Sequence, residues 1–294
     1  MTVTVLGATG KTGSAVVQGL LGAGVAVRAV ARSADKLAGL AKRGAKVVAA
    51  DVGDPAALTA AFRGSDAVYA MIPGDYTKGD LLGQYQRAAA AIAHAVRESG
   101  VPRVAFLSSL GAERSSGTGP IVGLHHAEER LRAIEGLDLL LLRAGYFHEN
   151  FFGSLELIKH QGVNGGAVKP DVAVTMIAAQ DIGVAAAQAL TKGDFSGVVV
   201  REMVGPRPLT MPEATRVLGR AIGKPELAYV QFPDAGFVEG LKGAGFSADA
   251  AALFLEMCQA FNNGLVSSQP GSQRVTTSTT FETFAESFAQ AYRS

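Results

Sequence analysis

The sequence predicts a mixed α/β protein: a doubly wound parallel sheet of the Rossmann type, followed by a smaller C-terminal α/β region. Short apolar runs alternate with Ala- and Leu-rich helical stretches, and a glycine-rich turn follows the first run. The alternation loosens after about residue 150. With 294 residues and 48% hydrophobic side chains, the chain is long enough to bury a full core without disulfides or metals.

The predicted strands of the first half are nearly continuous apolar runs, which is typical of strands buried on both faces. They are expected at 2–6, 26–31, 46–50, 67–71, 104–107 and 139–142. Apolar residues at helical spacing predict helices between them, at 11–21, 34–42, 55–62, 81–99 and 126–134. This order predicts right-handed βαβ units and assigns residues 1–150 to the Rossmann domain.

The second half is less regular, and its predicted elements are mixed. A helix is expected at 149–161, a glycine-rich loop at 162–170, a strand at 172–176, a helix at 181–190 and a strand at 198–200. From residue 212 the chain is expected to be mostly helical, with a short strand at 227–230. Residues 151–294 are therefore expected to form a smaller substrate-binding region, with later segments returning to the first domain.

The glycine-rich turn lies between the first predicted strand and the first predicted helix. It contains Gly7, Ala8, Thr9, Gly10, Lys11, Thr12 and Gly13. Glycines let the backbone approach a pyrophosphate, and free N–H groups at a helix start attract its charge. In this strand–turn–helix context the motif predicts an NAD(P)-binding site. The longer loop of a P-loop nucleotidase is absent, which disfavours ATP or GTP hydrolysis.

The end of the second predicted strand favours NADPH over NADH. An NAD site usually places an acid there for the ribose 2′-hydroxyl, whereas an NADP site uses Arg for the 2′-phosphate. This chain has Arg32 there, with Ser33 and Lys36 nearby, although Arg32 could also be a solvated strand-end residue. Asp51, after the third strand, is expected either to cap the adenine side or to be an ordinary turn residue.

Several segments resemble the NmrA-like atypical short-chain dehydrogenase/reductases. They are the glycine turn, Arg32-Ser33, Ala50-Asp51, Leu107-Ser108-Ser109-Leu110-Gly111-Ala112, residues 142–151 and residues 279–285. The resemblance runs nearly end to end and is more specific in the first 150 residues. Within the family, the chain is similar to the type-2 NADPH:quinone oxidoreductases. Other members reduce azo or triphenylmethane dyes, and some only sense the NADP/NADPH ratio.

The resemblance implies a cleft between a Rossmann domain and a small C-terminal domain. It implies that the glycine turn and Arg32 hold the cofactor phosphates, and that Met71, Ile72 and Pro73 run beside a cofactor ribose. It also implies that residues 145–150, among them Gly145, Tyr146, Phe147 and Asn150, flank the nicotinamide. This last segment follows a predicted parallel strand, at the edge where ligands of open α/β sheets bind.

The proton donor of standard short-chain dehydrogenases, the Tyr of a Tyr-x-x-x-Lys pair, has no counterpart here. None of the six tyrosines has a lysine four positions later. Quinones and similar conjugated acceptors need less help, because their reduced product is a stabilised anion and the hydride chemistry belongs to the nicotinamide. The sequence therefore favours a quinone-like acceptor over a ketone or an alcohol.

Few polar side chains remain as catalytic candidates. Ser108 ends the fifth strand, where related dehydrogenases keep a catalytic Ser, but a strand-end turn is an equal alternative. His148 lies in the nicotinamide-side segment and titrates near neutrality, so it is expected to donate a proton or only to pack there. His125 and His126, near the next helix, are either catalytic or part of a solvated cluster.

Composition excludes several other classes of function. The chain has 27 Lys and Arg against 26 Asp and Glu, a net charge of +1, so it has no basic field for nucleic acid. The single Cys258 excludes a disulfide framework and a Cys-based zinc site, and the five histidines form no recognisable metal-ligand set. No secretory signal and no membrane-length apolar run occur, which predicts a cytoplasmic protein without a membrane partner, and an oligomer is compatible with the sequence.

Two hypotheses follow from these observations. The first is an NADPH-dependent oxidoreductase that reduces a quinone or a similar small molecule in a cleft between residues 145–152 and C-terminal helices carrying Phe232, Phe237, Phe246 and Phe254. The alternative is a redox-sensing or regulatory protein that holds NADP(H) with little or no turnover. The missing Tyr and Lys agree with both hypotheses.

Overall fold

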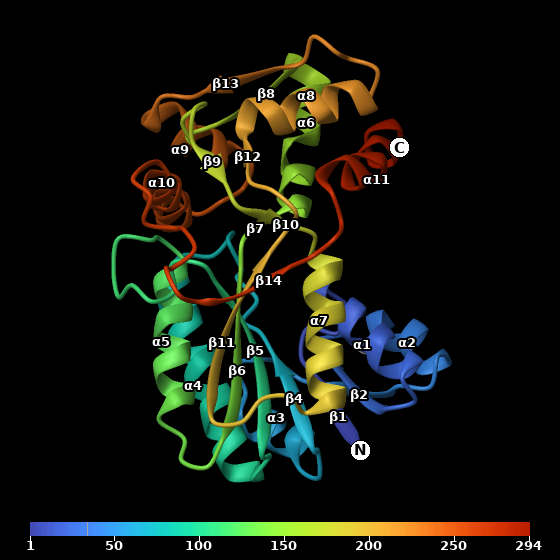
Figure 1. Ribbon diagram of the computed structural model, residues 1–294. Coiled ribbons are helices and arrows are strands. Elements are labelled where there is room, and N and C mark those ends of the chain that lie inside the picture. The colour runs from blue at the N-terminus through green and yellow to red at the C-terminus, as the bar shows by residue number, and fades with distance from the viewer. Residues whose placement is uncertain (34) are drawn as a thin grey trace.

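The computed structural model describes residues 1–33 and 35–294 and has two lobes (Figure 1). The larger lobe is built on an eight-stranded sheet of order β14-β11-β6-β5-β4-β1-β2-β3, in which all neighbours are parallel. Its strands are β1 Thr2–Val5, β2 Ala26–Ala31, β3 Lys46–Ala49, β4 Ala67–Ala70, β5 Arg103–Ser109, β6 Asp138–Ala144, β11 Val198–Val204 and β14 Gln273–Thr276. The predicted Rossmann-type doubly wound sheet is confirmed.

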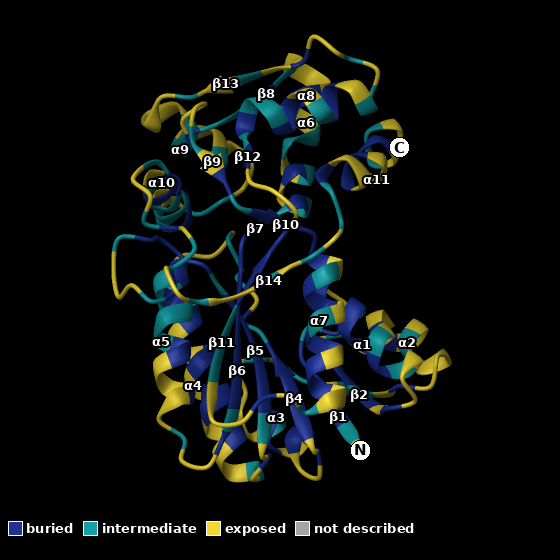
Figure 2. Cartoon of the chain, in the orientation of Figure 1, coloured by how far each residue is buried: buried dark blue, intermediate teal, exposed yellow. Residues whose placement is uncertain are grey.

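Helices cover both faces of this sheet, and the strands between them are buried (Figure 2). One face packs against α1 Lys11–Gly22 and α7 Ala179–Lys192, with α2 Ala38–Lys42 beside them. The other face packs against α3 Pro55–Phe62, α4 Leu81–Ser99 and α5 Ile121–Arg132. Each layer encloses its own apolar cluster, which explains why the strands carry apolar residues on both sides.

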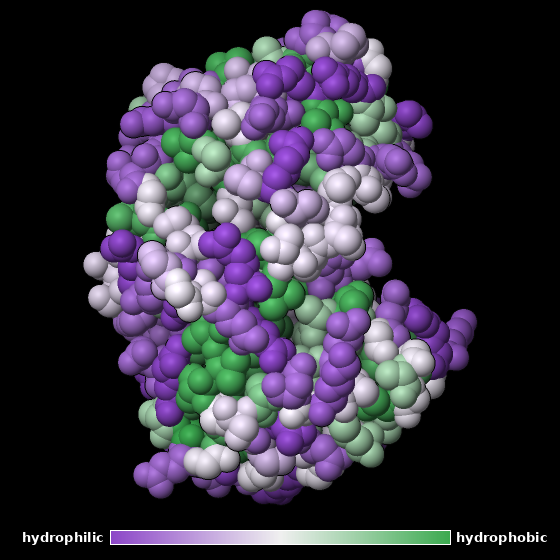
Figure 3. All heavy atoms as spheres, in the orientation of Figure 1, coloured by the Kyte–Doolittle hydropathy of each residue, from purple (hydrophilic) through white to green (hydrophobic). Residues whose placement is uncertain are grey.

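The smaller lobe has a third apolar core and only short paired strands. The pairs join β7 Tyr146–Phe147 to β10 Met176–Ile177, β8 Val163–Gly166 to β13 Ala228–Gln231, and β9 Ala173–Val174 to β12 Leu209–Thr210. Its helices are η2 His148–Ser154, α6 Leu155–Gln161, α8 Met211–Ala221, α9 Asp234–Gly243, α10 Ala248–Asn262 and α11 Phe281–Arg293. In Figure 3 the outline of the molecule is indented between α11 and the α1–α7 pair.

The chain crosses between the lobes more than once. Helix α7 packs along α1, and β11 and β14 extend the main sheet beyond β6, although all three lie after residue 150. In the described part of the chain, no helix is long and apolar enough to cross a membrane.

Several element boundaries differ from the sequence expectation. Helix α5 begins at Ile121 rather than at residue 126. Strand β11 runs on to Val204 because it stays paired with β6 as far as Met203 and with β14 as far as Val204. The helix expected at 149–161 is a 3-10 turn, η2, followed by α6. The helix expected at 34–42 is a short 3-10 helix, η1 Asp35–Leu37, followed by α2, and its first residue, Ala34, lies outside the described residues.

Short strands account for the remaining differences. The loop expected at 162–170 contains β8, and the strand expected at 172–176 is divided into β9 and β10. Strands β12 and β14 were not predicted. Each contains only two to four residues, so alternation of apolar and polar side chains carries little signal there.

Candidate functional site

The glycine turn has a shape that only glycine permits at two positions. Gly7 has φ of 62°, and a Cβ on it would lie 2.8 Å from the Met71 sulfur. A Cβ on Gly13 would lie 2.2 Å from the carbonyl oxygen of Gly7. The Gly10 amide donates to that same carbonyl at 2.8 Å, which closes the turn before α1 begins at Lys11. The turn is therefore tight, and the Met71 side chain packs against it at Gly7.

The start of α1 offers free backbone donors. Gly10 is the N-cap, and none of the described side chains caps the N–H groups of the first turn. The first N–H groups of a helix have no intrahelical partner and lie at the positive end of its dipole. The glycine turn and the N-terminus of α1 thus have the arrangement with which other proteins bind the pyrophosphate of a cofactor.

A pocket of about 230 Å³ adjoins this turn. The residues that line it come from the carboxyl ends of β1, β2, β3 and β4 and from α3: Leu6, Gly7, Thr9, Gly10, Val30, Ala31, Arg32, Ala50, Val52, Leu58, Met71 and Pro73. The pocket therefore combines the glycine turn with Arg32 and an apolar patch. Val52 and Leu58 were not predicted, because nothing distinguishes them in the sequence from residues of the core.

Not every residue of the predicted cofactor site reaches this pocket. Ala8 and Thr12 are buried, with the Ala8 amide bonded to Val30 O at 3.1 Å. Ile72 is buried in the apolar cluster between the sheet and the helices α3, α4 and α5. Asp51 is exposed, and its carboxylate accepts the Gly53 amide at 2.8 Å, as expected of a turn residue.

Arg32 is exposed at the rim of the pocket and makes no ion pair within the described residues. Ser33 and Lys36 follow it in the chain, half-buried and exposed respectively, and neither lines the pocket. The guanidinium is thus available to an anionic group of a ligand that fills the space beside the glycine turn.

The segment after β6 is fixed by backbone contacts between the lobes. The Gly145 amide donates to Met203 O at 3.0 Å, and the Tyr146 amide donates to Thr175 O at 2.9 Å. A Cβ on Gly145 would lie 2.6 Å from the Thr175 carbonyl oxygen, so glycine is needed for this approach. Tyr146 packs its ring against Phe151 and Phe261, and Phe147 is half-buried. Asn150 is exposed.

Lys11 connects the glycine turn to this segment. Its Nζ donates to the Glu149 carbonyl oxygen at 3.0 Å and lies 5.4 Å from the centre of the Phe152 ring. The Glu149 carboxylate accepts the Ala179 amide at the start of α7. Burial lowers the pKa of Lys11, and the nearby Glu149 partly offsets this, while burial raises the pKa of Glu149. No sequence pattern predicts this contact, because its two residues are 138 positions apart.

His148 points into the small-lobe core. It is 2% exposed, and its ring packs edge-on against Phe281 at 5.0 Å and beside Phe284 at 5.6 Å. Burial lowers the pKa of His148 to about 4, so the ring is neutral at pH 7. Both features count against His148 as a proton donor, and the geometry favours the packing role.

Ser108 is also buried. Its hydroxyl donates to Glu128 Oε1 at 2.6 Å, and the Glu128 carboxylate accepts two bonds from Arg143, from Nε at 2.9 Å and from Nη2 at 2.7 Å. Arg143 reaches Glu113 as well, at 3.2 Å. The serine hydroxyl thus belongs to an ion-pair network that joins β5, α5 and β6, which favours a structural role. Of the two helix histidines, His125 bonds to Ala112 O through Nδ1 at 2.9 Å, and His126 is half-buried.

The tyrosines do not replace the missing proton donor. Burial raises the pKa of Tyr69, Tyr76, Tyr85, Tyr146 and Tyr229. A phenol with a raised pKa is a weaker acid near neutral pH than one assisted by a lysine. Among the described residues, no group of three or more His, Cys, Asp or Glu is arranged to hold a metal ion.

Aromatic side chains fasten the loop after β4 to the small lobe. Tyr76 stacks on Phe246 at 5.4 Å and meets Phe254 edge-on at 5.0 Å. The Asp249 carboxylate accepts the amides of Asp80 and Leu81 at the start of α4. Phe246 and Phe254, two of the four phenylalanines expected in the acceptor cleft, are thereby held beside the loop that follows Met71 and Pro73.

Comparison with known proteins agrees with this architecture. The sequence model of the NmrA-like family matches residues 1–285. Quinone oxidoreductase 2 of Escherichia coli strain K12 is 29% identical over 248 residues, which cover 83% of this chain and 82% of that protein. An NAD(P)H azoreductase of Xenophilus azovorans is 29% identical over 228 residues, covering 76% and 74% of the two chains. A crystal structure of an E. coli NADPH-dependent quinone oxidoreductase complexed with NADPH has a TM-score of 0.78 at 25% identity and covers 97% of this chain and 99% of that one.

Proposed function

The chain belongs to the NmrA-like family, and from this premise we propose that it is an NADPH-dependent oxidoreductase that reduces a quinone or a similar conjugated small molecule. The observation that carries the proposal is the pocket that joins the glycine turn, Arg32 and Met71. The relatives named as quinone and azo reductases support the choice of acceptor class.

The residues of the pocket fit NADPH group by group. The glycine turn and the uncapped start of α1 would hold the pyrophosphate, since the pocket adjoins Gly7, Thr9 and Gly10. Arg32, at the rim of the pocket, would hold the 2′-phosphate; Ser33 and Lys36 follow it in the chain but do not line the pocket. Val52 and Leu58 provide apolar surface for the adenine, and Met71 and Pro73 border the path toward residues 145–150.

When bound, NADPH supplies the hydride. The chain would bind the cofactor and orient the acceptor. Gly145 lets the segment after β6 lie against Thr175, and the hydrogen bond from Lys11 to the Glu149 carbonyl connects that segment to the glycine turn. A cofactor that holds the turn in place would thereby also fix the segment that flanks the acceptor. Correct placement of two reactants accounts for a large share of catalysis when little acid–base work is required.

The acceptor follows from the proton chemistry. With the pKa values of five tyrosines raised, the pKa of His148 lowered and the Ser108 hydroxyl bonded to Glu128, none of these seven side chains is a strong proton donor. A ketone requires a proton as the alkoxide develops, whereas a quinone gives a stabilised anion that water can protonate. This difference favours a conjugated acceptor.

The test is NADPH oxidation, followed by its ultraviolet absorbance, with quinones, azo dyes and simple ketones at equal concentration. We expect turnover with quinones and little with ketones. Faster turnover of ketones than of quinones would overturn the acceptor class.

A redox-sensing binder is the second candidate, and the same absence of a proton donor favours it. It predicts tight NADPH binding with no oxidation across the whole acceptor panel. Measured turnover of any acceptor at a rate set by enzyme concentration would exclude a purely sensory role.

A further inference from the structure

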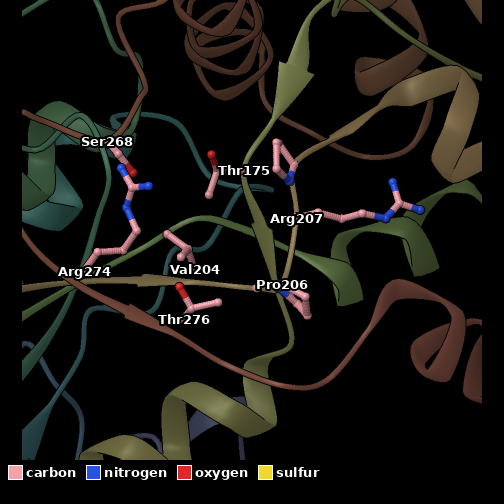
Figure 4. A pocket seen from close by; sticks show the side chains of 9 residues that line it. Thr175, Val204, Pro206, Arg207, Ser268, Arg274 and Thr276 are labelled. Carbon is pink, nitrogen blue, oxygen red and sulfur yellow. The ribbon is translucent and has the colours of Figure 1, made fainter.

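A second pocket, of about 200 Å³, lies where β11 and β14 end (Figure 4). Val204 and Thr276, neighbours in the register of these two strands, form its floor, and the loop after β11 forms one wall. It shares no lining residue with the pocket beside the glycine turn. Like that pocket, it is at the carboxyl edge of the parallel sheet, where ligands of open α/β sheets bind.

Four of the five polar side chains that line this pocket are donors without recorded partners in the described part of the chain. Arg274 and the hydroxyls of Ser268, Thr276 and Thr175 line it, and none of them makes a side-chain hydrogen bond or ion pair that the structure records within residues 1–33 and 35–294. In Figure 4 the Arg274 guanidinium lies beside Ser268. No aspartate or glutamate lines the pocket.

Two acids lie close to the pocket in the fold. Glu202 is opposite Arg274 in the strand register, but it is 1% exposed; its Oε1 accepts the Gln269 amide at 2.8 Å, and its buried Oε2 has no recorded partner, so it makes no ion pair with Arg274 within the described residues. Arg207 also lines the pocket, yet its guanidinium bonds to Glu282 at 3.1 Å and points away from Arg274 in Figure 4. The positive charge that remains at this site is therefore that of Arg274.

We propose that this pocket binds the phosphate group of a small molecule. A guanidinium donates two parallel bonds to a phosphate, and hydroxyls from three other directions can serve its remaining oxygens. The walls are stiff, since Pro206 and Pro208 border the pocket and the Gly205 amide is bonded to Met176 O at 2.7 Å. The inference goes beyond the oxidoreductase function and does not depend on it.

The test is calorimetric titration of the full chain with inorganic phosphate and with phenyl phosphate, at constant ionic strength. NADPH is present in excess, so that its own phosphates occupy the turn and Arg32. We expect Arg274→Gln to weaken binding of both ligands by about tenfold or more, because a charged hydrogen-bonding partner is lost. Ser268→Ala should weaken it by a smaller factor.

Arg130→Gln is the matched control, since Arg130 is an exposed arginine on α5 that does not line the pocket. Arg274 is exposed, so thermal unfolding of its variant should match that of the parent chain. Tighter binding of phenyl phosphate than of inorganic phosphate would identify a phosphate ester as the ligand, and equal binding would identify free phosphate. No binding of either ligand, or equal losses in the Arg274 and Arg130 variants, would overturn the proposal.

Discussion

Replacing Arg32 by glutamine should weaken NADPH binding by about 10- to 100-fold and leave NADH binding nearly unchanged. The two cofactors differ only in the 2′-phosphate, and Arg32 is the one arginine that lines the pocket beside the glycine turn. A hydrogen bond to a charged group contributes about 1.5–3 kcal/mol, and about 1.4 kcal/mol corresponds to a factor of ten. Because Arg32 is exposed and has no recorded ion pair, its loss should not change the stability of the fold.

The assay is titration of NADPH and of NADH, monitored by cofactor fluorescence, with the parent chain and the variant. Arg43→Gln is the control, since Arg43 is an exposed arginine just past α2 that does not line the pocket. It removes the same charge from the same region and should change the NADPH affinity less than about threefold, as expected for a screened surface charge. Equal weakening of NADPH and NADH by Arg32→Gln would refute the assignment of Arg32 to the 2′-phosphate.

Three further predictions concern the turn and the buried polar groups. Gly13→Ala would place its new Cβ 2.2 Å from Gly7 O. It should destabilise the fold by about 1–3 kcal/mol, measured by urea unfolding, and weaken NADPH binding. A stable variant with normal affinity would contradict the tight turn. His148→Phe should leave the pH–rate profile unchanged. Since the His148 pKa is lowered to about 4 on folding, the unfolded chain binds more protons between about pH 6.5 and 4, and stability falls as pH falls through this window. The measurement is the decrease in unfolding free energy from pH 7 to pH 5. This decrease should be smaller in the variant than in the parent chain by up to about 2 kcal/mol. Glu128→Ala, which leaves Arg143 buried without its two-bond partner, should cost about 3–5 kcal/mol, and Ser108→Ala should cost about 1 kcal/mol with kcat nearly unchanged.

The turn and the positions of the first six strands along the chain were predicted from the sequence because their signals are local. Gly7 needs positive φ and Gly13 needs close backbone approach, and both requirements are imposed within seven residues. The central strands β1, β4, β5 and β6 are buried on both faces, so their residues are mostly apolar whatever their neighbours are. Arg32 was predicted for a similar reason, since a residue at the end of β2 reaches the carboxyl edge in any sheet of this type.

The contacts of Lys11, His148 and Ser108 were not readable in this way. A lysine in the turn suggests a phosphate contact, but its Nζ bonds to Glu149 because the small lobe brings that carbonyl within reach. A histidine beside the nicotinamide segment suggests acid–base chemistry, but the direction of its ring depends on where α11 packs. Side-chain direction at such sites is decided by elements far away in the chain.

The sequence by itself predicted the fold class, the tight glycine turn and the place of Arg32 beside that turn, because each follows from backbone geometry or from periodicity within a short segment. The tertiary structure alone decided which polar groups are free. Long-range packing buried His148 among phenylalanines, bonded Ser108 to Glu128, and left Arg274 without a counterion at the edge of the sheet. Whether a polar side chain already has a hydrogen-bond partner or is free to bind a ligand depends on its neighbours in space. A local sequence pattern does not identify those neighbours.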